Sequence, residues 1–318
     1  MGTMIKKEPD PMISLLLLKQ IAQLFLCMLL GFCLVRAKLP KPADSRVLSA
    51  VVLYVVMPCV IVDSFQIDCT AEMLQGLALS LGTAVLIHVV MFLLTYLLRR
   101  PLRPGPAEQA SAIYSNAGNF IVPIVSAILG REWIIFTSMY VIVQLPLLWS
   151  HCRILLSGER TISLRKILLN VNIVSIFVGA VLFFLHISPP DLVVGTMESV
   201  SSMVGPMCMM VAGMLMGNVD FRRLVASRGI WKVTFLQLVG YPLVVMMLLK
   251  YSGLARLAPN GETILLVSFL AAITPSASSV TQIAQVYGSD GEYAGSINVV
   301  TTLLRIITMP LIIALYQF

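Results

Sequence analysis

Two short runs of small polar residues and proline interrupt apolar segments of the chain. The first run contains Asn116, Asn119 and Pro123, and the second contains Pro275, Ser276 and Ser278. Asparagine amides and serine hydroxyls can both donate and accept hydrogen bonds. Proline breaks a helix because it lacks an N–H donor and clashes with the preceding turn. We therefore predict two broken helices whose free N–H groups and polar side chains hold a carboxylate or a neutral polar group.

Four more polar residues are candidates because they lie in apolar segments. Gln282 follows the second interruption, and Gln144 and Asn298 occupy matching places in the two halves of the chain. Arg305 lies within the last apolar segment. A charge inside a membrane helix costs about 2.5–3.5 kcal/mol on insertion scales, so such a residue is expected to have a function. We expect Arg305 to attract an anion or to pair with a carboxylate.

Each candidate also has a purely structural interpretation. Asparagines can cap broken helix ends or join neighbouring helices, and serine hydroxyls can bond to carbonyl groups within their own helix. Arg305 could instead extend to a water-filled cavity or to the surface. An unwound backbone in hydrocarbon survives only where it is buried or lines a cavity, which favours the binding role for Asn116 and Asn119.

The composition is that of a membrane protein. Hydrophobic residues make up 58% of the 318 residues, charged residues 12%, and the mean hydropathy is +0.93, whereas a soluble domain has about 25% charged residues. The net charge of +7 does not indicate nucleic-acid binding, because the basic residues lie in short loops between apolar segments. The six cysteines and three histidines show no metal-ligand or nucleophile–base spacing, so we expect neither a metal site nor an enzyme.

The chain has room for ten membrane-spanning segments of roughly 20–25 residues. We expect them at 12–35, 45–65, 73–98, 107–129, 132–149, 167–185, 193–216, 230–249, 263–286 and 294–316. This divides the chain into a tail (1–10), a first five-helix repeat (11–153), a cytoplasmic linker (154–166) and a second five-helix repeat (167–318).

The distribution of charge predicts the orientation of these segments. The loops after the first, third, fifth and seventh segments contain 15 of the 22 Lys and Arg residues. Because basic loops stay in the cytoplasm, both termini are expected outside. Five segments in each half then make the two halves inverted repeats. Three pairs of prolines recur in the same order in the two halves, namely Pro58 and Pro206, Pro123 and Pro275, and Pro146 and Pro310.

Several motifs together resemble the auxin efflux carrier family, the prokaryotic relatives of plant PIN carriers, within the bile-acid:sodium-symporter-like superfamily. They are Gly31 to Arg36, Met57-Pro58, Ser115 to Asn119 with Pro123, Asn170 to Asn172 and Thr274-Pro275. The resemblance covers nearly the whole chain through the order and spacing of these motifs.

The resemblance implies an all-α fold in which broken helices 4 and 9 cross at mid-membrane. Segments 1, 2, 6 and 7 would form a scaffold, through which a homodimer would assemble, and the other six would form a mobile transport domain of an elevator-type carrier. It also implies transport of organic anions such as auxin-like or dicarboxylate compounds. Neither interruption contains an acidic residue, unlike the sodium-site glutamate of bile-acid symporters, so sodium is possible but not indicated.

Three functional hypotheses remain open at this point. The first is an inner-membrane carrier that exports a small organic anion. The second is a sodium- or proton-coupled uptake symporter for the same class of solute, in which backbone carbonyls with Ser278 and Gln282 would hold sodium. The third is a membrane sensor built on a transporter fold, which the absence of any soluble signalling domain in the sequence makes the weakest.

Overall fold

A computed structural model describes residues 11–39, 44–67, 70–158, 165, 168–217, 227–287 and 289–317. The side chains of residues 11–21, 46, 118–119, 123, 127–128, 215, 306 and 317 are outside this description. The expected tail (1–10) and most of the expected linker (154–166) also lie outside it.

The described part of the chain is helical, and its only β-type pairing is one isolated bridge. In the first half the helices are α1 (Pro11–Arg36), α2 (Ser45–Val51), η2 (Val52–Val56), α3 (Met57–Ser64), α4 (Ala71–Leu102), α5 (Pro106–Ile113), α6 (Ala117–Ile128), η3 (Arg131–Trp133), α7 (Ile134–Leu147), η4 (Leu148–Cys152) and α8 (Arg153–Ser157). In the second half they are α10 (Val171–Leu185), α11 (Asp191–Ser201), α12 (Val204–Met216), α14 (Arg228–Phe235), η5 (Leu236–Gly240), α15 (Tyr241–Tyr251), η6 (Leu254–Leu257), α16 (Gly261–Ala272), α17 (Ser278–Val286) and α18 (Gly291–Gln317).

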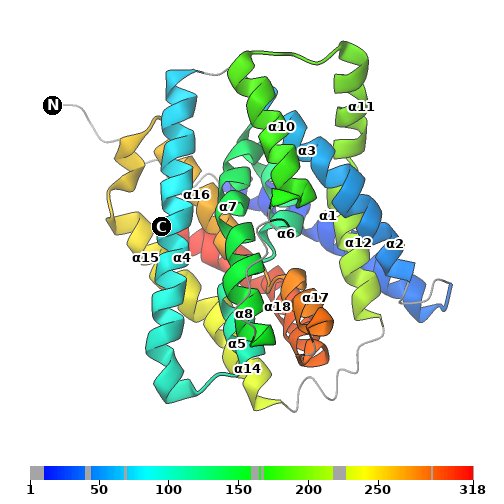
Figure 1. Ribbon diagram of the computed structural model, residues 1–318, viewed down its shortest axis with the longest axis vertical. Helices are drawn as coiled ribbons and strands as arrows, with labels where there is room; N and C mark the ends of the chain where they lie inside the picture. Colours follow the sequence, from blue (N-terminus) through cyan, green and yellow to red (C-terminus); the bar gives the residue numbers. More distant parts are fainter. Residues whose placement is uncertain are drawn as a thin grey trace.

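These helices cover all ten segments that the sequence predicts to be helical, and the two predicted interruptions separate α5 from α6 and α16 from α17. One boundary differs, because the helix after α7 continues through α8 to Ser157, into the stretch expected as linker. Figure 1 shows α4, α10 and α11 extending along the long axis of the molecule.

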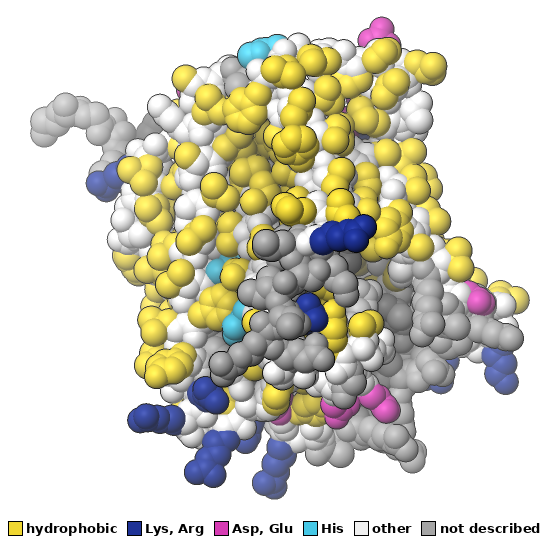
Figure 2. All heavy atoms as spheres, viewed as in Figure 1, with side chains coloured by type: hydrophobic (Ala, Val, Ile, Leu, Met, Phe, Trp, Pro, Cys, Tyr) yellow, Lys and Arg dark blue, Asp and Glu magenta, His cyan; other side chains and the backbone are white. Residues whose placement is uncertain are grey.

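Five helical stretches in the described residues are long and apolar enough to cross a membrane, and a sixth is added if the two parts of α18 count as one span. The five are Val47–Ser64, Ala71–Leu102, Arg131–Ser157, Asp191–Met214 and Arg228–Tyr251. In Figure 2, hydrophobic side chains cover most of the upper part of the visible face, and several Lys and Arg side chains gather at the lower edge of the molecule. The chain is therefore a multi-pass membrane protein, and the number of ten spans stays a prediction.

Glycines allow two pairs of helices to pack closely, the first of them at backbone distance. A Cβ atom on Gly31 of α1 would lie 2.1 Å from the carbonyl oxygen of Met210 in α12, and one on Gly213 would lie 1.8 Å from that of Met28. A Cβ atom on Gly179 of α10 would lie 2.6 Å from the Phe65 ring, which follows α3. Helix α1 thus packs on α12, and α10 packs on α3.

Prolines account for several irregular turns. The π-helical turns η2 and η5 each end two residues before a proline, Pro58 and Pro242 respectively, and η4 begins two residues after Pro146. A proline cannot donate to the carbonyl of the preceding turn and crowds it, so the helix widens locally. In α18 the axis bends by 58° between Gly291–Arg305 and Ile307–Tyr316, because Pro310 cannot donate to the carbonyl group four residues before it.

Candidate functional site

The two interruptions lie against each other and satisfy each other's backbone groups. The N–H of Asn116 donates to the carbonyl of Pro275 at 2.7 Å, and the N–H of Ala277 donates to the carbonyl of Tyr114 at 2.9 Å. Ser115 and Ser276 form the antiparallel bridge between these bonds. All these residues except Asn116 are buried, where an unpaired backbone group is costly. The pairing therefore replaces the hydrogen bonds that are lost where each helix is interrupted.

Gln144 of α7 holds the first interruption in place. Its Nε2 donates to the carbonyl of Ser115 at 2.7 Å, and the Ser115 hydroxyl donates to its Oε1 at 2.9 Å. The Gln144 side chain is buried, so both ends of its amide serve this one residue. Its described contacts therefore make Gln144 a positioning residue for the interruption.

Asn298 of α18 makes the corresponding contact in the second half. Its Nδ2 donates to the carbonyl of Ser276, while the N–H of Ser276 donates to the hydroxyl of Thr301 at 3.2 Å. An amide from the last helix of each half thus holds the bridging serine of that half. The Ser276 hydroxyl, in contrast, is buried and has no hydrogen-bond partner in the part of the chain that the structure describes.

The half-helices α6 and α17 begin at this paired backbone. Asn116 is the N-cap of α6 and Ala277 is the N-cap of α17, and neither side chain makes a capping hydrogen bond. The first N–H groups of a helix have no intrahelical partner and carry partial positive charge. Two such ends, side by side, favour a negatively charged group.

Arg305 is a buried cation within the helical bundle. Its side chain is only 1% exposed, and its Nη2 and Nη1 donate to the carbonyls of Gln237 and Leu238 at 2.8 and 3.5 Å. Pro242 lies four residues after Leu238 and five after Gln237, so it cannot donate the N–H that either carbonyl would accept in an α- or π-turn. Arg305 therefore supplies donors that Pro242 lacks.

The charge of Arg305 is not neutralised by these carbonyls. Among the described residues no Asp or Glu forms an ion pair with it, and its Nε is buried without a hydrogen-bond partner. Arg305 lies one helical turn, about 6 Å of rise, beyond Thr301, which binds the second interruption. It also lines a small cavity of ≈ 30 Å³. The other lining residues are Leu24, Phe25, Met28, Phe120, Ile124, Met209 and Met309.

The remaining sequence candidates have different outcomes. Pro275 is buried and accepts the hydrogen bond from Asn116, and Ser278 is half-buried at the start of α17. Gln282 is exposed on α17, and none of the hydrogen bonds between described residues joins its side chain to the paired interruptions. Asn119 and Pro123 lie in α6, but their side chains are outside the described residues. The sequence reasoning missed Ser115, Thr301 and the carbonyls near Pro242, since no local pattern links them to their partners.

Two comparisons with known sequences bear on this arrangement. The sequence model of a family described as "Membrane transport protein" matches residues 16–161 and, separately, residues 160–313. The two matches divide the chain at the place where the sequence predicts the boundary between its halves. A search of curated proteins found no match.

Proposed function

Since the chain belongs to the auxin efflux carrier family of membrane transport proteins, we propose that it is a secondary transporter that moves a small organic anion, such as a carboxylate, across the membrane. Membership of a transport family also favours a carrier over an enzyme or a sensor. The proposal for the solute depends on the chemistry around the paired interruptions.

The observation that carries the proposal is the buried guanidinium of Arg305 without a carboxylate partner in the described structure. A buried charge is costly unless it is paired, and a carboxylate solute would supply the missing counter-charge. The side-chain amide of Gln237, whose carbonyl binds Arg305, is also buried without a hydrogen-bond partner among those residues. A polar solute is the kind of group that would satisfy both.

We further propose ten spans with both termini outside, and an elevator motion of α4–α8 and α14–α18 against a scaffold of α1–α3 and α10–α12. The packing of α1 on α12 and of α10 on α3 supports this division. In an inverted repeat α1 corresponds to α10 and α3 corresponds to α12, so these are equivalent contacts. We also propose that the protein lies in the inner membrane as a homodimer through the scaffold helices, on which Phe177 and Phe184 expose apolar surface.

Efflux is the direction that needs no coupled ion. An inside-negative potential drives an anion outward by about 2.3 kcal/mol per charge per 100 mV. The alternative of a coupled uptake symporter gains less support from the geometry, because the carbonyls of Tyr114, Ser115, Pro275 and Ser276 already accept hydrogen bonds.

The test is release of radiolabelled benzoate, lactate or succinate from proteoliposomes at pH 7.5. We expect at least one of these anions to leave faster than from protein-free liposomes, and an imposed inside-negative potential to accelerate it. The variant Arg305→Gln should slow release about tenfold or more, the equivalent of one charged hydrogen bond. Release that is indifferent to the potential would exclude uniport, and release equal to that of protein-free liposomes for all three would exclude these anions as solutes.

A further inference from the structure

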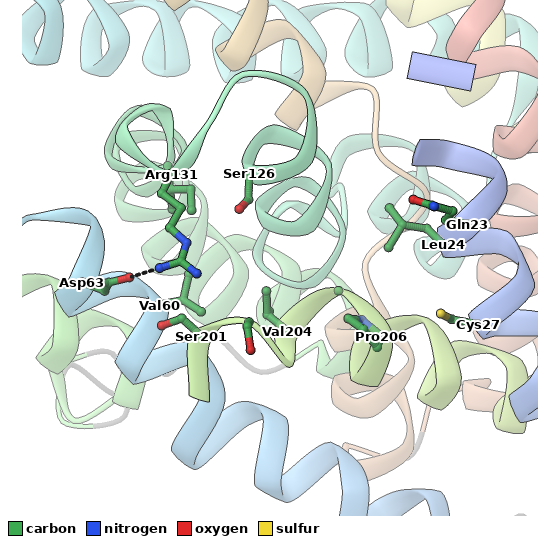
Figure 3. Close-up of a pocket in the computed structure, with 13 residues that line it drawn as sticks. Gln23, Leu24, Cys27, Val60, Asp63, Ser126, Arg131, Ser201, Val204 and Pro206 are labelled. Carbon is green, nitrogen blue, oxygen red and sulfur yellow. Dashed lines mark ion pairs between the residues drawn. The ribbon is translucent and has the colours of Figure 1, made fainter. Parts of the chain in front are cut away.

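A second and larger cavity lies beside the first one, between α1, α3 and α11–α12 on one side and α6, η3 and α7 on the other (Figure 3). Its volume is ≈ 260 Å³. The sequence reasoning assigned no function to any residue that lines it. Most of its apolar lining comes from α1, α3 and α12, and its polar lining consists of Gln23, Asp63, Ser126, Arg131, Ser201 and Ser202.

Arg131 provides the positive charge of this cavity. It follows Gly130, whose φ of 109° and ψ of 165° are open only to glycine, and this turn directs Arg131 from the α6–α7 connection toward the other half of the cavity wall. Its Nη1 lies 3.9 Å from a carboxylate oxygen of Asp63 in α3 and 3.8 Å from one of Glu198 in α11. Figure 3 shows the guanidinium reaching from the connection toward Asp63.

These two ion pairs leave the donors of Arg131 available. Charge-assisted hydrogen bonds have N···O distances of about 2.7–2.9 Å, and both pairs are about 1 Å longer. The Arg131 and Glu198 side chains are 48% and 54% exposed, and an exposed pair of this kind contributes only about 0–1 kcal/mol, whereas the Asp63 side chain is 12% exposed. A carboxylate that approaches within hydrogen-bond distance would therefore compete well with Asp63 and Glu198.

An independent observation indicates that a polar ligand belongs in this cavity. Ser201 is 6% exposed, and its hydroxyl has no hydrogen-bond partner within the described ranges. In Figure 3 Ser201 lies on the same side of the cavity as the Asp63–Arg131 pair. A buried hydroxyl without a partner is costly, and a ligand oxygen bound beside Arg131 would give it one.

The larger cavity also adjoins the cavity next to Arg305. Leu24 of α1 lines both of them, and on α6 Ser126 lines the larger cavity while Ile124 lines the smaller one. A solute that passes Leu24 would therefore move between the surroundings of Arg305 and those of Arg131.

We propose that Arg131 is an exit site for the carboxylate group of the transported solute, where the solute displaces Asp63 and Glu198 from the guanidinium after it leaves Arg305. In the proposed orientation the connection that carries Arg131 lies on the outer side of the membrane. This inference rests on the proposed function, because it assumes that the solute is an organic anion. In the empty carrier, the two carboxylates occupy the place of the solute's carboxylate. Asp63 and Glu198 therefore compete with the solute's carboxylate for the guanidinium of Arg131.

The competition gives a prediction that a merely structural ion pair would not. Binding of benzoate, lactate and succinate to the purified full-length protein in detergent is measured by titration calorimetry, for the wild type, Arg131→Gln, Arg131→Lys, Asp63→Asn, Glu198→Gln and Arg305→Gln. For the anion that binds, Arg131→Gln should weaken affinity about tenfold and Arg131→Lys less. Asp63→Asn and Glu198→Gln should each strengthen it about two- to fivefold.

Several outcomes would overturn the proposal. Unchanged affinity in Arg131→Gln would do so, as would Asp63→Asn and Glu198→Gln both weakening binding, since a structural pair loses function when either partner is removed. If Arg131→Gln does not fold, the two carboxylate variants still decide the matter. Loss of binding in Arg305→Gln alone would refute the exit site and leave the proposed function standing, whereas no binding of any of the three anions to the wild type would reject both.

Discussion

The contact between Arg305 and the helix turn before Pro242 predicts an energetic coupling between two residues that are distant in sequence. The Nη atoms of Arg305 donate to two carbonyls at 2.8 and 3.5 Å, and Pro242 cannot donate a backbone N–H to either of them. In Arg305→Met they become unpaired in an apolar interior. In Pro242→Ala the new N–H can serve one of them without the arginine.

The magnitude follows from the hydrogen bonds alone. A hydrogen bond to a charged group contributes about 1.5–3 kcal/mol, and a buried carbonyl left unpaired costs about 1–3 kcal/mol. Removing Arg305 also removes the cost of burying its charge, so the effect of the single variant on stability has no fixed sign. The double-mutant cycle cancels that cost, and we expect Arg305→Met to be less destabilising by about 1–2 kcal/mol in the Pro242→Ala background.

The assay is thermal unfolding of the four proteins in one detergent, with carboxylate binding as a second measurement. The coupling should raise the melting temperature of the double variant by about 2–4 °C above the additive value. Anion binding should stay lost in the double variant, because the new backbone N–H carries no charge. Additive melting temperatures would refute the claim that Arg305 compensates for Pro242, and recovery of binding in the double variant would refute its role as the counter-charge.

Three further predictions concern packing and backbone geometry; the first is measured by the yield of folded protein and the other two by the melting temperature of the purified protein. Gly213→Val should prevent the close packing of α12 on α1 and yield little folded protein. The matched control Gly82→Val should be tolerated, since a Cβ atom there has no neighbour within 4 Å. Equal yields of the two variants would contradict the backbone contact between α12 and α1. Gln144→Leu leaves the carbonyl of Ser115 without its partner, and the Ser115 hydroxyl keeps only the Tyr140 hydroxyl at 3.5 Å. The variant should cost about 1–3 kcal/mol, and an unchanged melting temperature would show that the amide does not hold the interruption. Gly130→Ala should cost about 1–3 kcal/mol because of its positive φ, so a neutral result would mean that the turn before Arg131 adopts another conformation.

The helices and their interruptions could be predicted because their causes are local. Apolar length fixes where a membrane helix can lie, and Asn116 and Pro275 mark segments in which a continuous helix is unfavourable. Gln144 and Asn298 were predicted as matching residues because their positions within the two halves correspond, and each donates to the carbonyl of a bridging serine. Their role in holding Ser115 and Ser276 could not be predicted, because it depends on how two distant helices are oriented about their axes.

Other parts of the site could not be predicted from the sequence, because they depend on tertiary packing. The sequence shows that Arg305 lies in an apolar segment, but only the fold shows that its donors meet carbonyls freed by a proline more than sixty residues away. Gln282 was expected near the second interruption and is exposed, because proximity along a helix does not determine which face a side chain occupies. The cavity beside Arg131 joins short segments from both halves of the chain, so no single motif could indicate it.

The hydrogen bonds between Tyr114–Asn116 and Pro275–Ala277 have a mechanical consequence. If the segment around α6 slid past the segment around α17, two N–H groups and two carbonyls would lose their partners in surroundings without water, at a cost of several kcal/mol for each group. Any large displacement during a transport cycle must therefore carry both segments together. The paired interruptions therefore form one rigid unit built from both halves of the chain, and neither half of this unit can move without the other.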